Sequence, residues 1–111
     1  MNKRMVEGFE VTEGSGNIFA DLALPDAEKL HIKSGLVIEI NRAIHRLQLT
    51  QGEAAKRMGI SQPKVSALMR GAFSNFSERK LMDCLNRLGY DIEIKLKPAA
   101  APTGQLILAI A

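Results

Sequence analysis

Residues 50 to 71 decide the fold; they read Thr-Gln-Gly-Glu-Ala-Ala-Lys-Arg-Met-Gly-Ile-Ser-Gln-Pro-Lys-Val-Ser-Ala-Leu-Met-Arg-Gly. Thr50 stands three residues before Glu53, which is the spacing of a capping box. This spacing predicts a helix from Gln51 to about Met58. Gly59 suits the left-handed residue that commonly ends a helix.

A second short helix is expected directly after this turn. Ser61 is a suitable N-cap, and Pro63 is tolerated because it falls in the first helical turn. Val65 and Leu68 are spaced to bury the inner face, and Gly71 ends the helix. Two short helices joined by a tight turn have the layout of a helix-turn-helix, whose second helix enters the major groove of DNA.

Positive charge is concentrated around this motif. The whole chain of 111 residues has a formal net charge of +3, whereas residues 41–70 carry six basic groups against one acid, Glu53. Residues 1–40 sum to −3 and residues 71–111 to +1. This distribution favours a polyanionic partner, although a solvated basic surface would have the same composition.

Three further helical segments flank the motif. Residues 17–24 hold enough apolar side chains for a short helical turn. Pro25 begins a helix well, and an apolar stripe predicts that this helix continues to Leu47 with a break near Gly35. Ser77 is expected to cap a last helix, which Gly89 stops. The expected fold is therefore mainly α.

A half-buried strand is predicted after the last helix. Residues 90–97 alternate apolar and charged side chains for eight positions. A lone strand leaves its backbone unpaired, so we expect antiparallel pairing with the same strand of a second copy about a two-fold axis. A hairpin with residues 105–110 of the same chain is the alternative. The predicted dimer interface consists of Tyr90, Ile92, Ile94 and Leu96.

This interpretation divides the chain into three parts. Residues 1–16 form a flexible N-terminal segment, residues 17–89 the helix-turn-helix domain, and residues 90–111 a strand extension. No apolar run approaches the ~20 residues of a membrane helix, and no signal peptide is recognisable, so we expect a cytoplasmic protein without membrane contact.

The composition gives no indication of catalysis or of a bound group. Cys84 lies among apolar positions and is expected to be a buried, inert thiol. His31 and His45 have no further ligand at metal spacing, so no metal site is predicted. Carboxylate clusters, nucleophile motifs and phosphate-binding glycine loops are missing from the sequence. We therefore expect neither an enzyme nor a cofactor.

The residues of the motif resemble a known family. Its positions Leu49-Thr-Gln, Ala54-Ala55, Gly59-Ile-Ser-Gln, Val65-Ser, Leu68 and Gly71 resemble the Cro/C1-type (lambda-repressor-like, XRE) helix-turn-helix family. This resemblance covers roughly residues 36–88. It implies a lambda-repressor-like five-helix domain that binds double-stranded operator DNA as a homodimer. The use of a C-terminal β-strand in dimerisation is the separate expectation from residues 90–97.

The flanking segments are similar to a narrower group. Residues 17–25 and 88–98 look like HigA-type antitoxins, which are encoded beside a RelE-like ribonuclease toxin. The resemblance implies a repressor of its own operon that also neutralises a RelE/HigB-like toxin. A stand-alone or phage-type transcriptional regulator with no toxin partner is the alternative.

The resemblance also implies roles for individual residues. Gln51 matches a phosphate-holding position, at a helix N-terminus that adds backbone donors. Gln62 matches the first base-contacting position, where its amide can bond an adenine edge twice. Arg70 matches a phosphate-contacting position. Pro63 departs from relatives that have a polar residue there, so few bases are expected to be contacted directly.

The remaining positions of the second helix complete the predicted interface. Lys64 and Ser66 project outward toward bases or backbone, although Ser66 can instead bond back to its own helix. The methyl group of Ala67 is suited to contact thymine. The full set of predicted DNA-binding residues is Gln51, Ser61, Gln62, Lys64, Ser66, Ala67 and Arg70.

Overall fold

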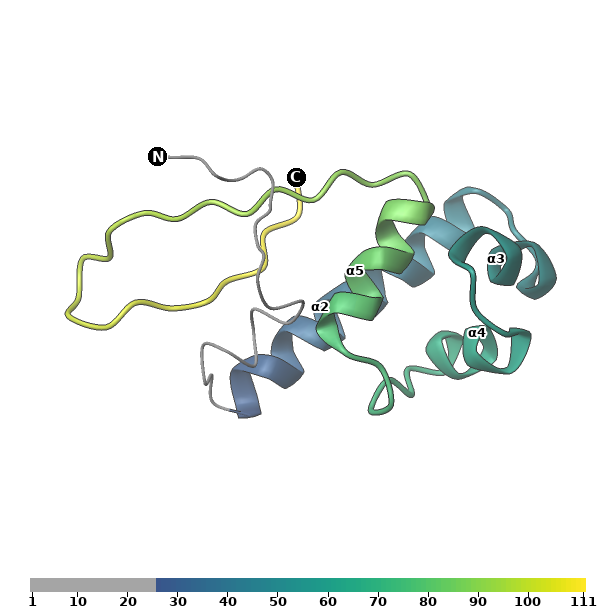
Figure 1. Ribbon diagram of the computed structural model, residues 1–111, viewed down its shortest axis with the longest axis horizontal. Coiled ribbons are helices and arrows are strands. Elements are labelled where there is room, and N and C mark those ends of the chain that lie inside the picture. The colour runs from purple at the N-terminus through teal and green to yellow at the C-terminus, as the bar shows by residue number, and fades with distance from the viewer. Residues whose placement is uncertain (1–25) are drawn as a thin grey trace.

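The computed structural model describes residues 26–111, with side chains from Leu30 onward. Four helices form within this range (Figure 1). They are α2 (Asp26–Arg46), α3 (Gln51–Met58), α4 (Gln62–Met69) and α5 (Glu78–Arg87). The flexible segment predicted at residues 1–16 and the helical turn predicted at 17–24 lie outside the described residues. None of the four helices has the length and apolarity that crossing a membrane requires.

The long helix α2 forms one side of the core. It is continuous through Gly35, so the break predicted there is wrong. An ideal Cβ at Gly35 would lie 2.6 Å from Leu108 Cδ2, which shows that a side chain distant in sequence covers this position. Packing over the glycine explains why the helix continues, since tertiary contacts can override the weak helix propensity of glycine.

The end of α2 carries a Schellman motif. The Leu49 amide donates to Ile44 O at 3.0 Å, and the Gln48 amide donates to His45 O at 3.1 Å. Gln48 has a φ of +55°, a left-handed conformation that usually selects glycine. This tight ending turns the chain directly into α3.

The predicted caps of the helix-turn-helix are confirmed. Thr50 Oγ1 accepts from the Glu53 amide at 3.1 Å, and Glu53 Oε1 accepts from the Thr50 amide at 2.8 Å. Gly59 ends α3 with a φ of +70°. Ser61 Oγ accepts from the Lys64 amide at 3.4 Å and caps α4.

The core lies between α2 and α5 and extends beneath α3 and α4. Helices α2 and α5 lie side by side, while α3 and α4 lie together at one end (Figure 1). Ala55 packs against this core and is partly buried. The buried apolar residues are Ile32, Leu36, Val37, Ile40, Ala43, Ile44, Ala54, Met58, Val65, Leu68, Phe76, Leu81, Cys84, Leu85 and Leu88.

The C-terminal arm, residues 91–111, leaves α5 in an extended path and turns back toward the helices (Figure 1). No strand forms anywhere in residues 26–111, so the strand predicted at 90–97 is not present in the single chain. From residue 91 onward, the backbone makes no hydrogen bond to the backbone of residues 26–111. The alternative hairpin with 105–110 is therefore not formed. An isolated extended segment cannot become a strand until a second backbone pairs with it.

Candidate nucleic-acid interface

Helix α4 is held with one face inward and the other open to solvent. Val65 and Leu68 are fully buried, which fixes the inner face. Asn41 on α2 donates through Nδ2 to Leu68 O at 3.0 Å and to Val37 O at 3.2 Å. The apolar contacts and this polar bridge together set the position of α4 relative to α2.

The predicted DNA-binding residues lie at the N-terminus of α3 and along α4. Ser61, Gln62, Lys64 and Arg70 are exposed. Three more are partly buried, namely Gln51, Ser66 and Ala67. The fold thus places all seven on one continuous unit, the two helices and their turn.

Ser66 and Arg70 contact each other one helical turn apart. Ser66 Oγ accepts from Arg70 Nη1 at 2.6 Å. The serine is therefore engaged with the arginine, and the alternative expectation of a bond back to its own helix is not what the structure shows. A guanidinium has five N–H donors, so Arg70 retains donors for a further acceptor.

The side chain of Gln62, at the N-terminus of α4, lies close to the N-terminus of α3. An ideal Cβ at Gly52 would lie 3.9 Å from Gln62 Oε1 and 4.0 Å from Thr50 Oγ1. The Gln62 amide therefore lies beside the first turn of α3. Helix N-termini favour negative charge because their backbone N–H groups are unpaired and their dipoles are positive there.

Among the described residues, the cations of the motif form no ion pair with a neighbouring carboxylate. In the described chain from Leu30 onward, ion pairs join Glu39 to Arg42, and Asp83 to both Lys80 and Arg87. None of the described ion pairs includes the four basic residues of α3 and α4, which are Lys56, Arg57, Lys64 and Arg70. Their field is therefore available to an anionic partner.

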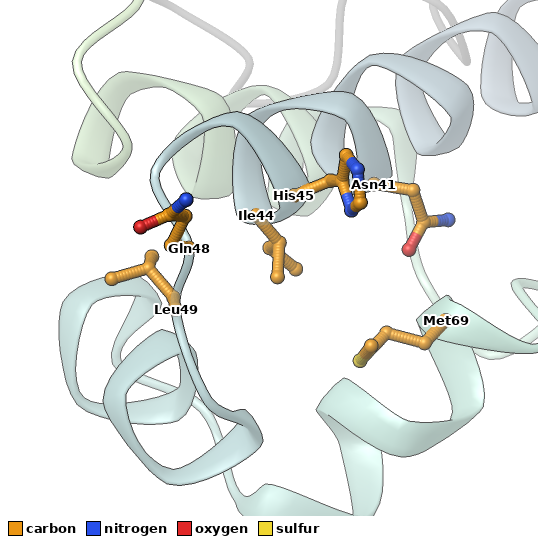
Figure 2. A pocket seen from close by; sticks show the side chains of 6 residues that line it. All are labelled: Asn41, Ile44, His45, Gln48, Leu49 and Met69. Atoms are coloured by element: carbon orange, nitrogen blue, oxygen red, sulfur yellow. The ribbon is translucent and has the colours of Figure 1, made fainter.

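A shallow hollow of about 370 Å³ lies between the end of α2 and the end of α4 (Figure 2). Its lining residues are Asn41, Ile44, His45, Gln48, Leu49 and Met69. This hollow was not predicted from the sequence. Gln48, which lines the hollow, has a left-handed conformation. Its residue type does not indicate this conformation, because glycine is usual at such a position. Asn41, which lines the hollow, also supplies the hydrogen bond from α2 to Leu68 O of α4.

Tyr90 is fixed against its own helical domain. Its hydroxyl donates to Glu39 Oε2 at 2.8 Å, and Arg46 Nη2 donates to the same hydroxyl at 3.4 Å. The Arg46 guanidinium carbon lies 5.8 Å from the centre of the Tyr90 ring, within the range of cation–π attraction. Tyr90 was predicted at a dimer interface, but in the structure it anchors the arm to α2. The periodicity of the sequence gave no indication of its partners, which lie 44 and 51 residues away.

The other three residues of the predicted dimer interface have no such anchor. Ile92, Ile94 and Leu96 are 36%, 57% and 94% exposed, so exposure rises with distance from the helical domain. These large apolar side chains are exposed on an extended segment that pairs with no described backbone. Such a segment is able to pair with the backbone of another chain.

Comparisons with known proteins agree with this geometry. A family model described as a helix-turn-helix domain matches residues 18–97. A solved structure described as an XRE-family transcriptional regulator is 40% identical, with a TM-score of 0.71; the match covers 78% of this chain and 100% of that one. No curated protein matches the chain. The chain therefore belongs to the helix-turn-helix family and is a DNA-binding transcriptional regulator of the XRE type.

Proposed function

We propose that this regulator is a repressor that binds the operator of its own gene through α3 and α4. The observation that carries the proposal is the exposed Gln62 beside the first turn of α3, next to cations without described carboxylate partners. In this proposal Gln62 bonds base edges, and Lys64, Ser66 and Ala67 follow it along the groove. Gln51, Ser61 and Arg70 face the phosphates.

We also propose that the operator-binding form is a homodimer joined through the C-terminal arm. In this arrangement residues 17–89 act as the DNA-binding domain and residues 90–111 as the dimerisation extension. A dimer places its two recognition helices in successive major grooves about 34 Å apart, so the operator is expected to be a near-palindrome. Ile94→Pro should block backbone pairing in the arm, and a full dimer of that variant in sedimentation would contradict this interface.

The direct test is titration of the DNA immediately upstream of the gene at several stated salt concentrations. Specific binding should exceed binding to an unrelated duplex, and both should weaken as salt rises because bound cations of the DNA are released. Absence of affinity for any duplex at low ionic strength would overturn the proposal.

We propose further that the protein is the antitoxin of a type II toxin–antitoxin pair in the cytoplasm. The resemblance of residues 17–25 and 88–98 to HigA-type antitoxins supports this assignment. A neighbouring reading frame encoding a basic RelE/HigB-like protein, and co-purification of its product with this chain, would support the antitoxin role. A gene standing alone would favour the second candidate, a regulator with no toxin partner.

A further inference from the structure

We infer that two copies of this chain pair their arms antiparallel in one register, with Ile94 opposite Ile94 on the two-fold axis. The inference rests on the proposed dimer and specifies its partner surface. The segment involved is Asp91-Ile-Glu-Ile-Lys-Leu-Lys97, all of which is exposed.

Charge complementarity selects the antiparallel direction. In an antiparallel pair centred on Ile94, Asp91 lies opposite Lys97 of the second copy, and Glu93 lies opposite Lys95. The two-fold axis repeats both pairs, so the ladder contains four attractive pairs and no directly opposed like charges. Parallel in-register pairing would instead place every charge against its own copy, and directly opposed like charges destabilise a sheet.

Charge also selects the register. A two-residue shift keeps the same face inward, because side chains alternate with a period of two. One such shift puts the axis on Glu93 and opposes two glutamates, and the other puts it on Lys95 and opposes two lysines. A one-residue shift would place the apolar face of one copy beside the charged face of the other. The register centred on Ile94 alone pairs every charge with its opposite.

The apolar face fits the same register. Ile92 lies opposite Leu96 of the second copy, and the two Ile94 side chains meet on the axis. Cross-strand pairs of large aliphatic residues cover each other when their Cβ atoms are about 5 Å apart. The register thus covers the three side chains that are exposed in the single chain.

The anchor at Tyr90 converts this register into a spacing between the two DNA-binding units. Tyr90 is fixed to its own α2 through Glu39. Eight residue steps along the ladder separate the two Tyr90 residues, which corresponds to about 27 Å at the usual rise per residue. A two-residue shift would change this distance by about 7 Å, which is roughly two base pairs of duplex. The charge pattern therefore fixes the half-site spacing that the dimer can bind.

A cysteine scan tests the register. Single cysteines are placed at residues 92, 93, 94, 95 and 96 and oxidised mildly, with the unaltered chain and its buried Cys84 as the control. Ile94→Cys should cross-link most, because opposed Cα atoms about 5 Å apart are within disulfide range. Cysteines at 93 or 95 would be diagonal and about 7–8 Å apart, beyond that range.

Charge exchange provides an independent test. Glu93→Lys or Lys95→Glu alone should weaken the dimer by about tenfold in sedimentation, because two pairs become repulsive. The double exchange should restore the dimer, since it pairs opposite charges again only when the axis lies on Ile94. In the registers centred on residue 93 or 95, the double exchange would still oppose like charges.

The outcomes separate the register from the dimer itself. A cross-linking maximum at 93 or 95, or equal yields along the segment, would overturn the register while leaving an arm-mediated dimer. A chain that sediments as a monomer at all tested concentrations and gives no cross-link would overturn the proposed dimer as well.

Discussion

The side-chain amide of Asn41 on α2 donates to the main-chain carbonyl of Leu68 on α4, with 3.0 Å between nitrogen and oxygen. Leu68 is fully buried, so this bond ends at the inner face of α4. The relationship connects the stability of the core to the position of the proposed DNA-binding surface.

Asn41→Ala should therefore weaken both folding and DNA binding. The Leu68 carbonyl keeps the Gly71 amide as a donor at 3.0 Å, so the variant loses the net contribution of the Asn41 bond, which should lower the free energy of unfolding by about 0.5–1.5 kcal/mol. Urea unfolding measures the stability, and operator titration of the folded variant measures the binding. Asn75→Ala, at an exposed loop position, is the matched control and should alter neither quantity.

Gln62→Ala should relax the choice of base. The loss on the preferred operator is expected to be about 1–3 kcal/mol, with a smaller loss on other duplexes, because an amide that bonds base edges contributes discrimination. Titrations against the operator and against single-base variants measure this difference. An equal loss on every sequence would contradict a base-contacting role for Gln62.

Arg70→Ala should weaken binding to all duplexes to a similar degree. Loss of one phosphate contact is expected to lower the slope of log affinity against log salt by about 1. Arg79→Ala removes the same charge from an exposed position on α5 and serves as the control. If both variants changed the salt slope equally, the effect would reflect net charge and not a contact made by Arg70.

Gln48→Gly should stabilise the fold. Gln48 holds a φ of +55°, which glycine adopts without a steric penalty, so the expected gain is about 0.5–1 kcal/mol. Thermal or urea unfolding measures the change. Gln51→Gly places the same substitution at the start of α3, where glycine is expected to destabilise the helix. A loss of stability in Gln48→Gly would show that the glutamine side chain contributes more than its conformation costs.

Cys84 should make folding stability sensitive to alkaline pH. Burial raises the pKa of the Cys84 thiol above its ordinary value of 9.0. Above pH 9.0 the unfolded thiol ionises while the folded one stays protonated, so stability is complete below this pH and falls as pH rises toward the folded pKa. Between pH 7 and 10, the free energy of unfolding should fall less steeply in Cys84→Ala than in the unaltered chain. A thiol reagent should modify the folded chain slowly and the unfolded chain rapidly.

The sequence predicted the helix-turn-helix closely because its signals are local. The Thr50 capping box, the left-handed Gly59 and the Ser61 cap all appear where the spacing placed them. One error has a non-local cause: the helix does not break at Gly35, because Leu108 covers it. Pairing of the arm as a strand needs a second backbone and stays a prediction, since no backbone within residues 26–111 pairs with it.

In the candidate site, too, local features were predicted and long-range contacts were not. Its exposed residues on α4 were predicted from the outward face of the helix and from the family resemblance. The bonds that fix the site were not predicted, because Asn41 reaches Leu68 across 27 residues and Tyr90 reaches Glu39 across 51. Alternation in residues 90–97 identified the apolar face, but it did not distinguish Tyr90, which bonds within its chain, from the isoleucines beyond it.

The contact of Leu108 with Gly35 shows that the packing of the helical core extends beyond residue 97. The family match stops at residue 97, yet Leu106 and Leu108 pack against the helical core. A chain shortened after Gly104 would uncover the glycine in the middle of α2 and the apolar surface around it. Residues 105–111 thus cover part of the core through Leu106 and Leu108, although they form no regular secondary structure.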